Sequence, residues 1–446
     1  AATLTNNGSL SFGNSCGSVD TSYYIKVHTN FGQKPFKYAP PAGFQPLNAA
    51  NVRPETVIVR PDQYVAATLY TSNNNTLSVS DYQFQPDLLI FKNRDTGNNW
   101  GWFDSVRGAN KQISSNRTNP EITTSGSGYG TGTMNSFDRN GFTLGDDVGS
   151  NVTNYPSGDG HVVYGFNAGG NKNTFNVDDV GYASAAAAGL DGGTINPTGA
   201  SVGTRQGFSI IKYTGNSTAN STLPHGLSEA PKFVIIKNLS NAYSWAVLHT
   251  DVGTTGTTLD GSPEYYMLQL DSNSGRGNYS QDTIWNPTSA TVKIDQSGGA
   301  NWVNNSNSSY IMYAWHDVPG LQKFGSYVGN GSADGPYVEL GFRPALLVVK
   351  SASVGGTSRN WAIIDSTRSF ANVGNHTLAW NLSGAESAFG DGASVNGANN
   401  KIDLLSNGFK MRDSGIFGNG SGNTYIYMAW AESPASNLYG GQSNAR

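Results

Sequence analysis

The stretch Pro86-Asp-Leu-Leu-Ile-Phe-Lys92 is the clearest indication of the fold, because its pattern recurs twice along the chain. Its other copies are Pro231-Lys-Phe-Val-Ile-Ile-Lys237 and Pro344-Ala-Leu-Leu-Val-Val-Lys350. Each stretch opens after a proline and has the length and apolar content of a buried β-strand. Three such runs predict an internal repeat.

Features on both sides of this stretch keep nearly the same spacing in every copy. A tyrosine precedes the proline by 16, 18 and 17 residues, and a closing tyrosine follows it by 78, 82 and 83 residues. A tryptophan strand lies between them and starts at Trp100, Trp245 and Trp361. This agreement indicates homologous modules, each about as long as a small domain. The opening tyrosines are Tyr70, Tyr213 and Tyr327, and the closing ones are Tyr164, Tyr313 and Tyr427.

The pattern between these landmarks predicts an all-β protein. Helical periodicity is almost absent, and turn signals such as Asn140-Gly141 and Asn407-Gly408 separate short runs of strand-forming residues. Many short strands in units of just over a hundred residues favour antiparallel β-sandwiches. We therefore expect a tandem array of three antiparallel β-sandwich modules, at residues 63–169, 206–319 and 320–432.

The remaining segments do not fit the repeat. Residues 1–62 are predicted to hold one or two strands, around Ser9–Phe12 and Tyr23–Val27, followed by an extended, proline-rich connector. Residues 170–205 have no counterpart between the second and third modules, so they are predicted to be an insertion or a long loop. Residues 433–446 form a C-terminal tail.

Composition excludes several classes of function. Charged residues make up 13% of the 446 residues, about half the usual share, and the formal net charge is −4. The chain therefore lacks the basic field that binds nucleic acid, and no apolar run is long enough for a membrane span. Cys16 is the single cysteine, which rules out an intramolecular disulfide framework and a cysteine-based zinc site.

The sequence offers little catalytic chemistry. Its six histidines stand singly, and no nucleophile elbow or phosphate-binding loop is present. Two acidic pairs, Asp146-Asp147 and Asp178-Asp179, are compatible with a glycosidase pair or a calcium site, but they match no calcium-loop pattern and are interpreted as solvated loop acids. We expect no catalytic residue, no cofactor and no metal site.

Two charged pairs recur at the same place in the repeat. Asp104-Ser-Val-Arg107 and Asp365-Ser-Thr-Arg368 both follow the tryptophan strand, whereas the second copy has His249-Thr-Asp251 there. A catalytic role would require the pair to lie in a cleft, and the second copy lacks the pair. The simpler interpretation is an aspartate–arginine contact that closes a strand end. These four residues are predicted to be structural.

The tryptophans divide into two groups. Those aligned by the repeat are expected to form three cores, one per module, because a large apolar residue at a constant position is usually buried. Three others, Trp285, Trp302 and Trp380, lie in less regular stretches. Since indole faces stack on sugar rings, these three are the candidates for exposed glycan contacts.

One segment resembles a known family. His225-Gly-Leu-Ser-Glu-Ala-Pro231, followed by its apolar strand, is similar to a repeated module in virion proteins of bacteriophages, especially marine and cyanobacterial ones. Phe91-Lys-Asn93 with Asp104–Gly108 agrees, as does the stretch between Asn30-Phe-Gly-Gln-Lys-Pro35 and Asn48-Ala-Ala-Asn51. In similar proteins that last stretch directly follows a SPRY-like or concanavalin-like β-sandwich.

The resemblance covers most of residues 30–432 and implies a phage appendage protein. Residues 1–33 then look like the last strands of a SPRY-like domain, and no catalytic residue carries over. We expect a non-enzymatic virion protein, most simply a tail fibre that contacts the host surface. The alternatives are a capsid decoration or head-spike protein that recognises no host, and a secreted glycan-binding or depolymerising protein.

These interpretations also predict partners and location. The protein is expected on the virion surface after synthesis in the host cytoplasm, in contact with other virion proteins and with a host surface glycan or protein. A homo-oligomer is expected, with a trimer as the first guess. Neither nucleic acid nor membrane insertion is expected.

Overall fold

The computed structural model describes residues 2–4, 10–12, 58, 60–126, 130–257, 263–277, 284–294, 302–353, 359–374, 376–388, 401–415 and 417–434. The chain divides into two compact units, residues 1–55 and 56–446. In the first unit, β1 (Ala2–Leu4) pairs antiparallel with β2 (Leu10–Phe12). Cys16, the predicted strand at Tyr23–Val27, most of the proline-rich connector and nearly all of the C-terminal tail lie outside the described residues.

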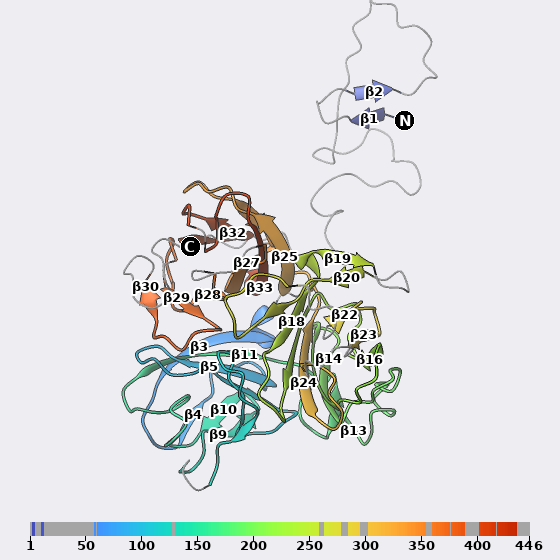
Figure 1. The fold of residues 1–446 in the computed structure, drawn as a ribbon. Helices are drawn as coiled ribbons and strands as arrows, with labels where there is room; N and C mark the ends of the chain where they lie inside the picture. The colour runs from blue at the N-terminus through green and yellow to red at the C-terminus, as the bar shows by residue number, and fades with distance from the viewer. Residues whose placement is uncertain are drawn as a thin grey trace, which may run out of the picture. The chain divides into compact units, whose positions relative to one another are not determined.

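The prediction of an all-β protein is confirmed, since the described residues contain strands and two short 3₁₀ helices but no α-helix (Figure 1). The 3₁₀ helices are η1 (Pro61–Gln63) and η2 (Thr250–Val252). The predicted Asn-Gly turns connect antiparallel neighbours: β9 (Met134–Asp138) to β10 (Gly141–Leu144), and β31 (Ile402–Leu405) to β32 (Gly408–Met411).

One antiparallel four-strand order recurs three times, once in each copy of the repeat. In each case the apolar strand lies inside the sheet, with a neighbour on both sides. Its residues 88–93, 233–238 and 346–351 are buried throughout, as expected for a strand covered on both faces. The first order is β3 (Val65–Thr71), β11 (Gly160–Phe166), β5 (Leu88–Asn93) and β6 (Gly101–Asp104). The second is β15 (Phe208–Thr214), β24 (Ser309–Trp315), β17 (Phe233–Asn238) and β18 (Ala246–His249). The third is β25 (Gln322–Val328), β33 (Thr424–Pro434), β27 (Phe342–Ser351) and β28 (Ala362–Asp365).

Strand register corrects one position of the sequence repeat. Tyr164 pairs with Ile90 and Tyr313 pairs with Ile235, at equal distances from the lysine that ends each apolar strand. The residue at that register in the third copy is Met428, whereas Tyr427 lies one position away. Because neighbouring residues in a strand point to opposite faces, Tyr427 belongs to a different core from Tyr164 and Tyr313.

A three-stranded antiparallel sheet accompanies each of these larger sheets. A separate hydrophobic cluster joins the two sheets of each copy; in the first, Phe91 of β5 meets Phe142 of β10 edge to face, with ring centroids 5.2 Å apart. The small sheets are β4 (Leu77–Val79) with β10 and β9; β16 (Ser221–Pro224), β23 (Thr291–Ile294) and β22 (Ile284–Trp285); and β26 (Tyr337–Glu339) with β32 and β31.

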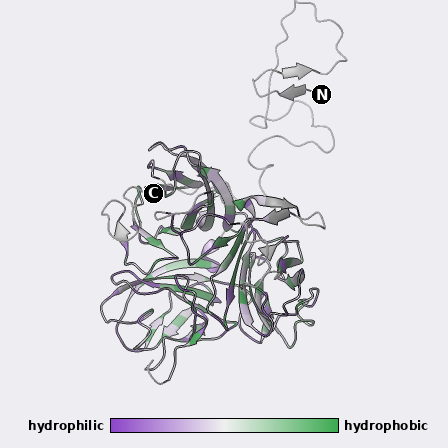
Figure 2. Ribbon diagram, viewed as in Figure 1, coloured by the Kyte–Doolittle hydropathy of each residue, from purple (hydrophilic) through white to green (hydrophobic). Residues whose placement is uncertain are grey.

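The aligned tryptophans were expected to form three cores, one per module. Instead they share a single core. Trp100, Trp245 and Trp361 belong to a single buried cluster that draws on all three copies. The physical reason is that each large sheet is apolar on both faces: one face packs on its own small sheet, and the other on the neighbouring copies. Hydrophobic residues accordingly follow the strands through the interior (Figure 2).

The segment at 170–205 is an ordered extension of a sheet and not a long loop. It forms β12 (Phe175–Val177), β13 (Val180–Tyr182) and β14 (Gly199–Gly203). Strand β14 pairs with residues 208–212 of β15, and the second copy's sheet has eight strands. Leu190 and Ile195 are buried in that copy's own cluster.

Short strands complete the architecture. In the first copy, β7 (Lys111–Gln112) pairs with β8 (Ile122–Thr123). In the second, β19 (Thr254–Thr257) pairs with β20 (Pro263–Tyr265), and β21 (Leu268–Gln269) pairs with β18. In the third, β29 (His376–Ala379) joins β28 to β30 (Ser387–Ala388).

Candidate functional site

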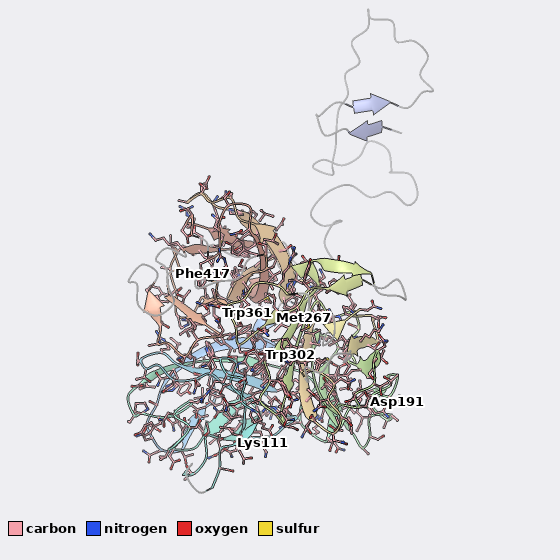
Figure 3. The ribbon with its side chains drawn as sticks, in the orientation of Figure 1. Lys111, Asp191, Met267, Trp302, Trp361 and Phe417 are labelled. Carbon is pink, nitrogen blue, oxygen red and sulfur yellow. The ribbon has the colours of Figure 1, made fainter. Side chains whose placement is uncertain are left out.

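The three copies are joined by equivalent tryptophan hydrogen bonds. Each tryptophan at the start of the tryptophan strand donates its indole N–H to backbone carbonyls of another copy. The bonds are Trp245 Nε1 to Ser114 O (3.1 Å) and Arg117 O (3.0 Å), Trp100 Nε1 to Ala379 O (2.8 Å) and Leu382 O (3.0 Å), and Trp361 Nε1 to Gln269 O (2.9 Å). The second copy thus binds the first, the first binds the third, and the third binds the second. The contacts close a ring, and Trp361, labelled in Figure 3, is fully buried.

A backbone hydrogen bond repeats with the same offset at all three contacts. Seven residues after the first carbonyl that each tryptophan binds, an amide N–H donates to the copy that carries the tryptophan. These bonds are Glu121 N to Leu239 O (3.1 Å), Glu386 N to Arg94 O (2.7 Å) and Arg276 N to Ala352 O (2.8 Å). Equal spacing at three places shows that the loops have one common geometry despite different sequences.

Buried lysines strengthen two of these contacts. Lys237 Nζ donates to Thr118 O (3.0 Å) of the first copy, and Lys350 Nζ donates to Ser274 O (2.7 Å) of the second. Burial lowers the pKa of each lysine to about 7. The lysine that ends each apolar strand therefore acts in the fold as a donor to backbone carbonyls.

The predicted strand-end pairs are formed and fully buried. Arg107 Nε contacts Asp104 Oδ2, and the Arg107 N–H donates to Asp104 Oδ1 (2.8 Å), with both side chains at 0% exposure. Arg368 holds Asp365 in the same way. The predicted aspartate–arginine contact therefore uses one backbone and one side-chain N–H of the arginine.

Sequence reasoning missed the third member of these pairs. Tyr313 of the second copy donates to Asp104 Oδ2 (2.7 Å), and Tyr164 of the first copy donates to Asp365 Oδ2 (2.8 Å). The buried pairs thus connect neighbouring copies. At the remaining contact the aspartate position holds His249 and the tyrosine position holds Met428. Because the aspartate and the tyrosine are both missing from this contact, the sequence indicates that the two residues belong together. Aligning Tyr427, instead of Met428, with Tyr164 and Tyr313 concealed this indication.

The three tryptophans predicted to contact glycans do not share one environment. Trp380 is 2% exposed, which contradicts its assignment to the surface. It immediately follows β29 and packs in the shared core against Trp102, with ring centroids 5.6 Å apart. Trp302 is half-buried against the second copy's cluster. The side chain of Trp285 lies outside the described residues.

The two acidic pairs differ in their exposure. Asp178 and Asp179 are exposed as expected, and Asp178 Oδ1 accepts from the Thr204 N–H (2.8 Å). Asp147, by contrast, is fully buried, and its Oδ2 accepts from three successive backbone N–H groups, at residues 152–154. It is therefore not a solvated acid but holds a loop in place. The described residues contain no cluster of three acidic, histidine or cysteine side chains that could hold a metal ion.

The candidate binding site is a cavity beside the loop between β7 and β8, here called the loop cavity. Its volume is about 210 Å³. Its polar lining includes Asn99, Gln112, Ser114, Arg117, Asn119 and Ser150. A larger, more open groove of about 470 Å³ lies between β3 and the third copy, with Asp62, Asp81 and Glu432 on its walls.

Trp245→Phe is expected to lower the free energy of unfolding by about 1–3 kcal/mol more than Trp430→Phe. Both indoles are buried in the shared core, so both changes leave a similar void. Only Trp245 loses hydrogen bonds to another copy, since Trp430 Nε1 has no partner in the described part of the chain. Urea unfolding of both variants measures the difference. Equal losses would contradict a role for the indole N–H in joining the copies.

A family model described as "Domain of unknown function (DUF7483)" matches residues 60–434. The chain belongs to the DUF7483 family. The match spans all three copies of the repeat and lies within the compact unit at 56–446. No curated protein and no solved structure matches the chain. In the described part of this DUF7483 protein, no helix has the length and apolar content of a membrane span.

Proposed function

We propose that this DUF7483 protein is a non-enzymatic virion protein that binds through its surface loops. The proposal rests on the contacts that the recurring polar residues make. Asp104, Arg107 and Tyr313, with their counterparts at the other contact, are buried between copies and occupied with one another. Groups committed to such contacts serve assembly of the chain, which leaves recognition to the loops that differ between copies.

The proposed architecture is three β-sandwich modules, one for each copy of the repeat. The pairing of one larger and one small sheet in every copy, with a separate cluster between them, supports this interpretation. The modules then close a ring through the tryptophan and lysine contacts, because the third copy binds both of the others. A ring of this kind is a rigid platform for loops.

The proposed location rests on the resemblance of His225–Pro231 and its following strand to phage virion modules. Within a virion, the protein most simply acts as a tail fibre or similar appendage that contacts a host surface glycan or protein. A capsid decoration protein that recognises no host is the second candidate. The low charge of the chain suits either role, since neither requires a strong field.

Immunogold electron microscopy of intact virions, with antibodies against residues 56–446, tests the location. Label at the tail or its fibres is the expected result. Label confined to capsid faces or vertices would replace the appendage with a decoration protein, and absence of label from virions would overturn the proposal. Incubation with host surface polysaccharide tests the enzymatic alternative: shortening that is lost in Asp146→Asn or Asp178→Asn would contradict a binding role.

A further inference from the structure

The loop cavity lies on the first copy, against the segment at 114–120. Gln112 and Ile113 form part of its buried wall, whereas Arg117, Asn119 and Ile122 are exposed at its rim. At about 210 Å³ it is smaller than the roughly 300–1,000 Å³ of sites that enclose drug-sized ligands. It therefore suits one small unit, such as a terminal residue of a longer chain.

The second copy holds this segment in position. Trp245 binds the carbonyls of Ser114 and Arg117, and Lys237 binds the carbonyl of Thr118. The Glu121 N–H is also bound, by Leu239 O. Because both ends and the middle of the segment are fixed by backbone contacts, its side chains are displayed on a preorganised loop, which lowers the entropic cost of binding a ligand.

Two polar side chains of the cavity have no partner of their own. In the part of the chain that the structure describes, neither the Arg117 guanidinium nor the Asn119 amide makes a hydrogen bond or ion pair. Gln112, in contrast, is fixed in the wall, where its Oε1 accepts from Ser150 Oγ (2.7 Å). The cavity thus combines a fixed polar wall with an unpaired cation and an unpaired amide at its rim.

The lining also contains apolar residues. Ile113, Pro120 and Ile122 line the cavity, and Ile122 is 39% exposed. A lining that combines carboxamides and hydroxyls with aliphatic carbon suits a sugar ring, which carries hydroxyl groups around its edge and C–H groups on its faces. The guanidinium adds a site for a carboxylate, which it binds with two parallel N–H groups.

We infer that the loop cavity binds an acidic saccharide unit, with its carboxylate on Arg117 and its hydroxyls on the carboxamides. This inference rests on the proposed function and names the ligand class of that binding surface. Divergence between copies supports it. Leu382 and Ser272 stand at the positions of Arg117, three residues after the first carbonyl bound by tryptophan, so among the three equivalent loops only that of the first copy has a cation at this position.

Titration of the full chain with methyl glucuronide and methyl galacturonide, followed by saturation-transfer NMR, tests the inference. The wild-type protein is expected to bind at least one of them with a Kd of roughly 1 mM, and methyl glucoside at least tenfold more weakly. Arg117→Ala is expected to weaken binding of the acidic glycoside at least tenfold. Arg117→Lys should fall between the two, since lysine keeps the charge but not the planar pair of donors.

Arg139→Ala is the matched control, because it removes another exposed arginine, from the β9–β10 turn of the same copy, and should leave binding unchanged. Asn119→Ala, which leaves every described contact between copies in place, provides a second variant of the cavity. Wild-type protein that binds no acidic glycoside, or binding that survives both Arg117→Ala and Asn119→Ala, would overturn the inference. Label on tail fibres would leave the proposed function standing in either case.

Discussion

Asp104→Asn is expected to lower the free energy of unfolding of the compact unit by about 3–5 kcal/mol. The change leaves the Arg107 guanidinium without its carboxylate at a site where both side chains are fully buried. Glu121 remains 3.3 Å from Arg107, but it contacts Nη1, whereas Asp104 contacts Nε. Urea unfolding followed by tryptophan fluorescence measures the loss, since Trp102 and Trp245 lie at the same contact.

Two further variants separate charge from packing at this contact. Tyr313→Phe removes one hydrogen bond to Asp104 and should cost about 1 kcal/mol. His249→Asp places a carboxylate at the equivalent position of the second copy, where Val252 stands in place of the arginine, and should destabilise the protein. If Asp104→Asn cost no more than Tyr313→Phe, the buried pair would not be a principal contact between copies.

Acidification from pH 7 to pH 5 is expected to destabilise the folded protein by about 5 kcal/mol. Burial lowers the pKa of His161, His225 and His249 to about 4 each. The unfolded chain therefore takes up these protons near pH 6.5 while the folded chain does not, which costs about 2 kcal/mol per histidine at pH 5. Asp87, whose pKa burial raises to about 6, binds a proton in the folded state and offsets about 1 kcal/mol.

Hydrogen bonds explain why His225 and His249 stay neutral. In each ring Nδ1 accepts from a backbone N–H two residues ahead, so Nε2 carries the proton and faces a carbonyl, Thr288 O or Tyr427 O. Protonation of Nδ1 would place its N–H against the backbone N–H that donates to it, so that two donors face each other. The double variant His225→Asn, His249→Asn should therefore flatten the pH dependence of stability between pH 7 and pH 5, whatever its stability at pH 7. An unchanged slope in thermal or urea unfolding would contradict this account.

The local pattern of the chain was predictable from sequence, but contacts between copies were not. The apolar strand at Leu88–Asn93 and the Asn140-Gly141 turn follow from composition and spacing over a few residues. Trp380 was misplaced at the surface because its burial depends on Trp102 of another copy. The strand β14 was predicted as part of an insertion or loop for the same reason, since its partner β15 is supplied by the second copy.

The loop cavity was predictable from sequence only in part. Its polar side chains stand in the printed sequence, but nothing local indicates that Trp245 and Lys237, more than a hundred residues away, fix the segment that carries them. The unpaired state of Arg117 is likewise a tertiary property. Arg107 is ten residues earlier in the same chain and is fully committed to Asp104.

The sequence alone establishes that this protein is a threefold repeat of short antiparallel strands, because strand propensity, apolar runs and turn residues act over a few neighbouring positions. It also determined which positions recur, including Asp104 with Arg107 and Asp365 with Arg368. Tertiary structure alone decided that the copies share one tryptophan core and close a ring. That outcome depends on which face of each sheet finds an apolar partner, and the partner lies in a different copy, beyond the range of any local pattern.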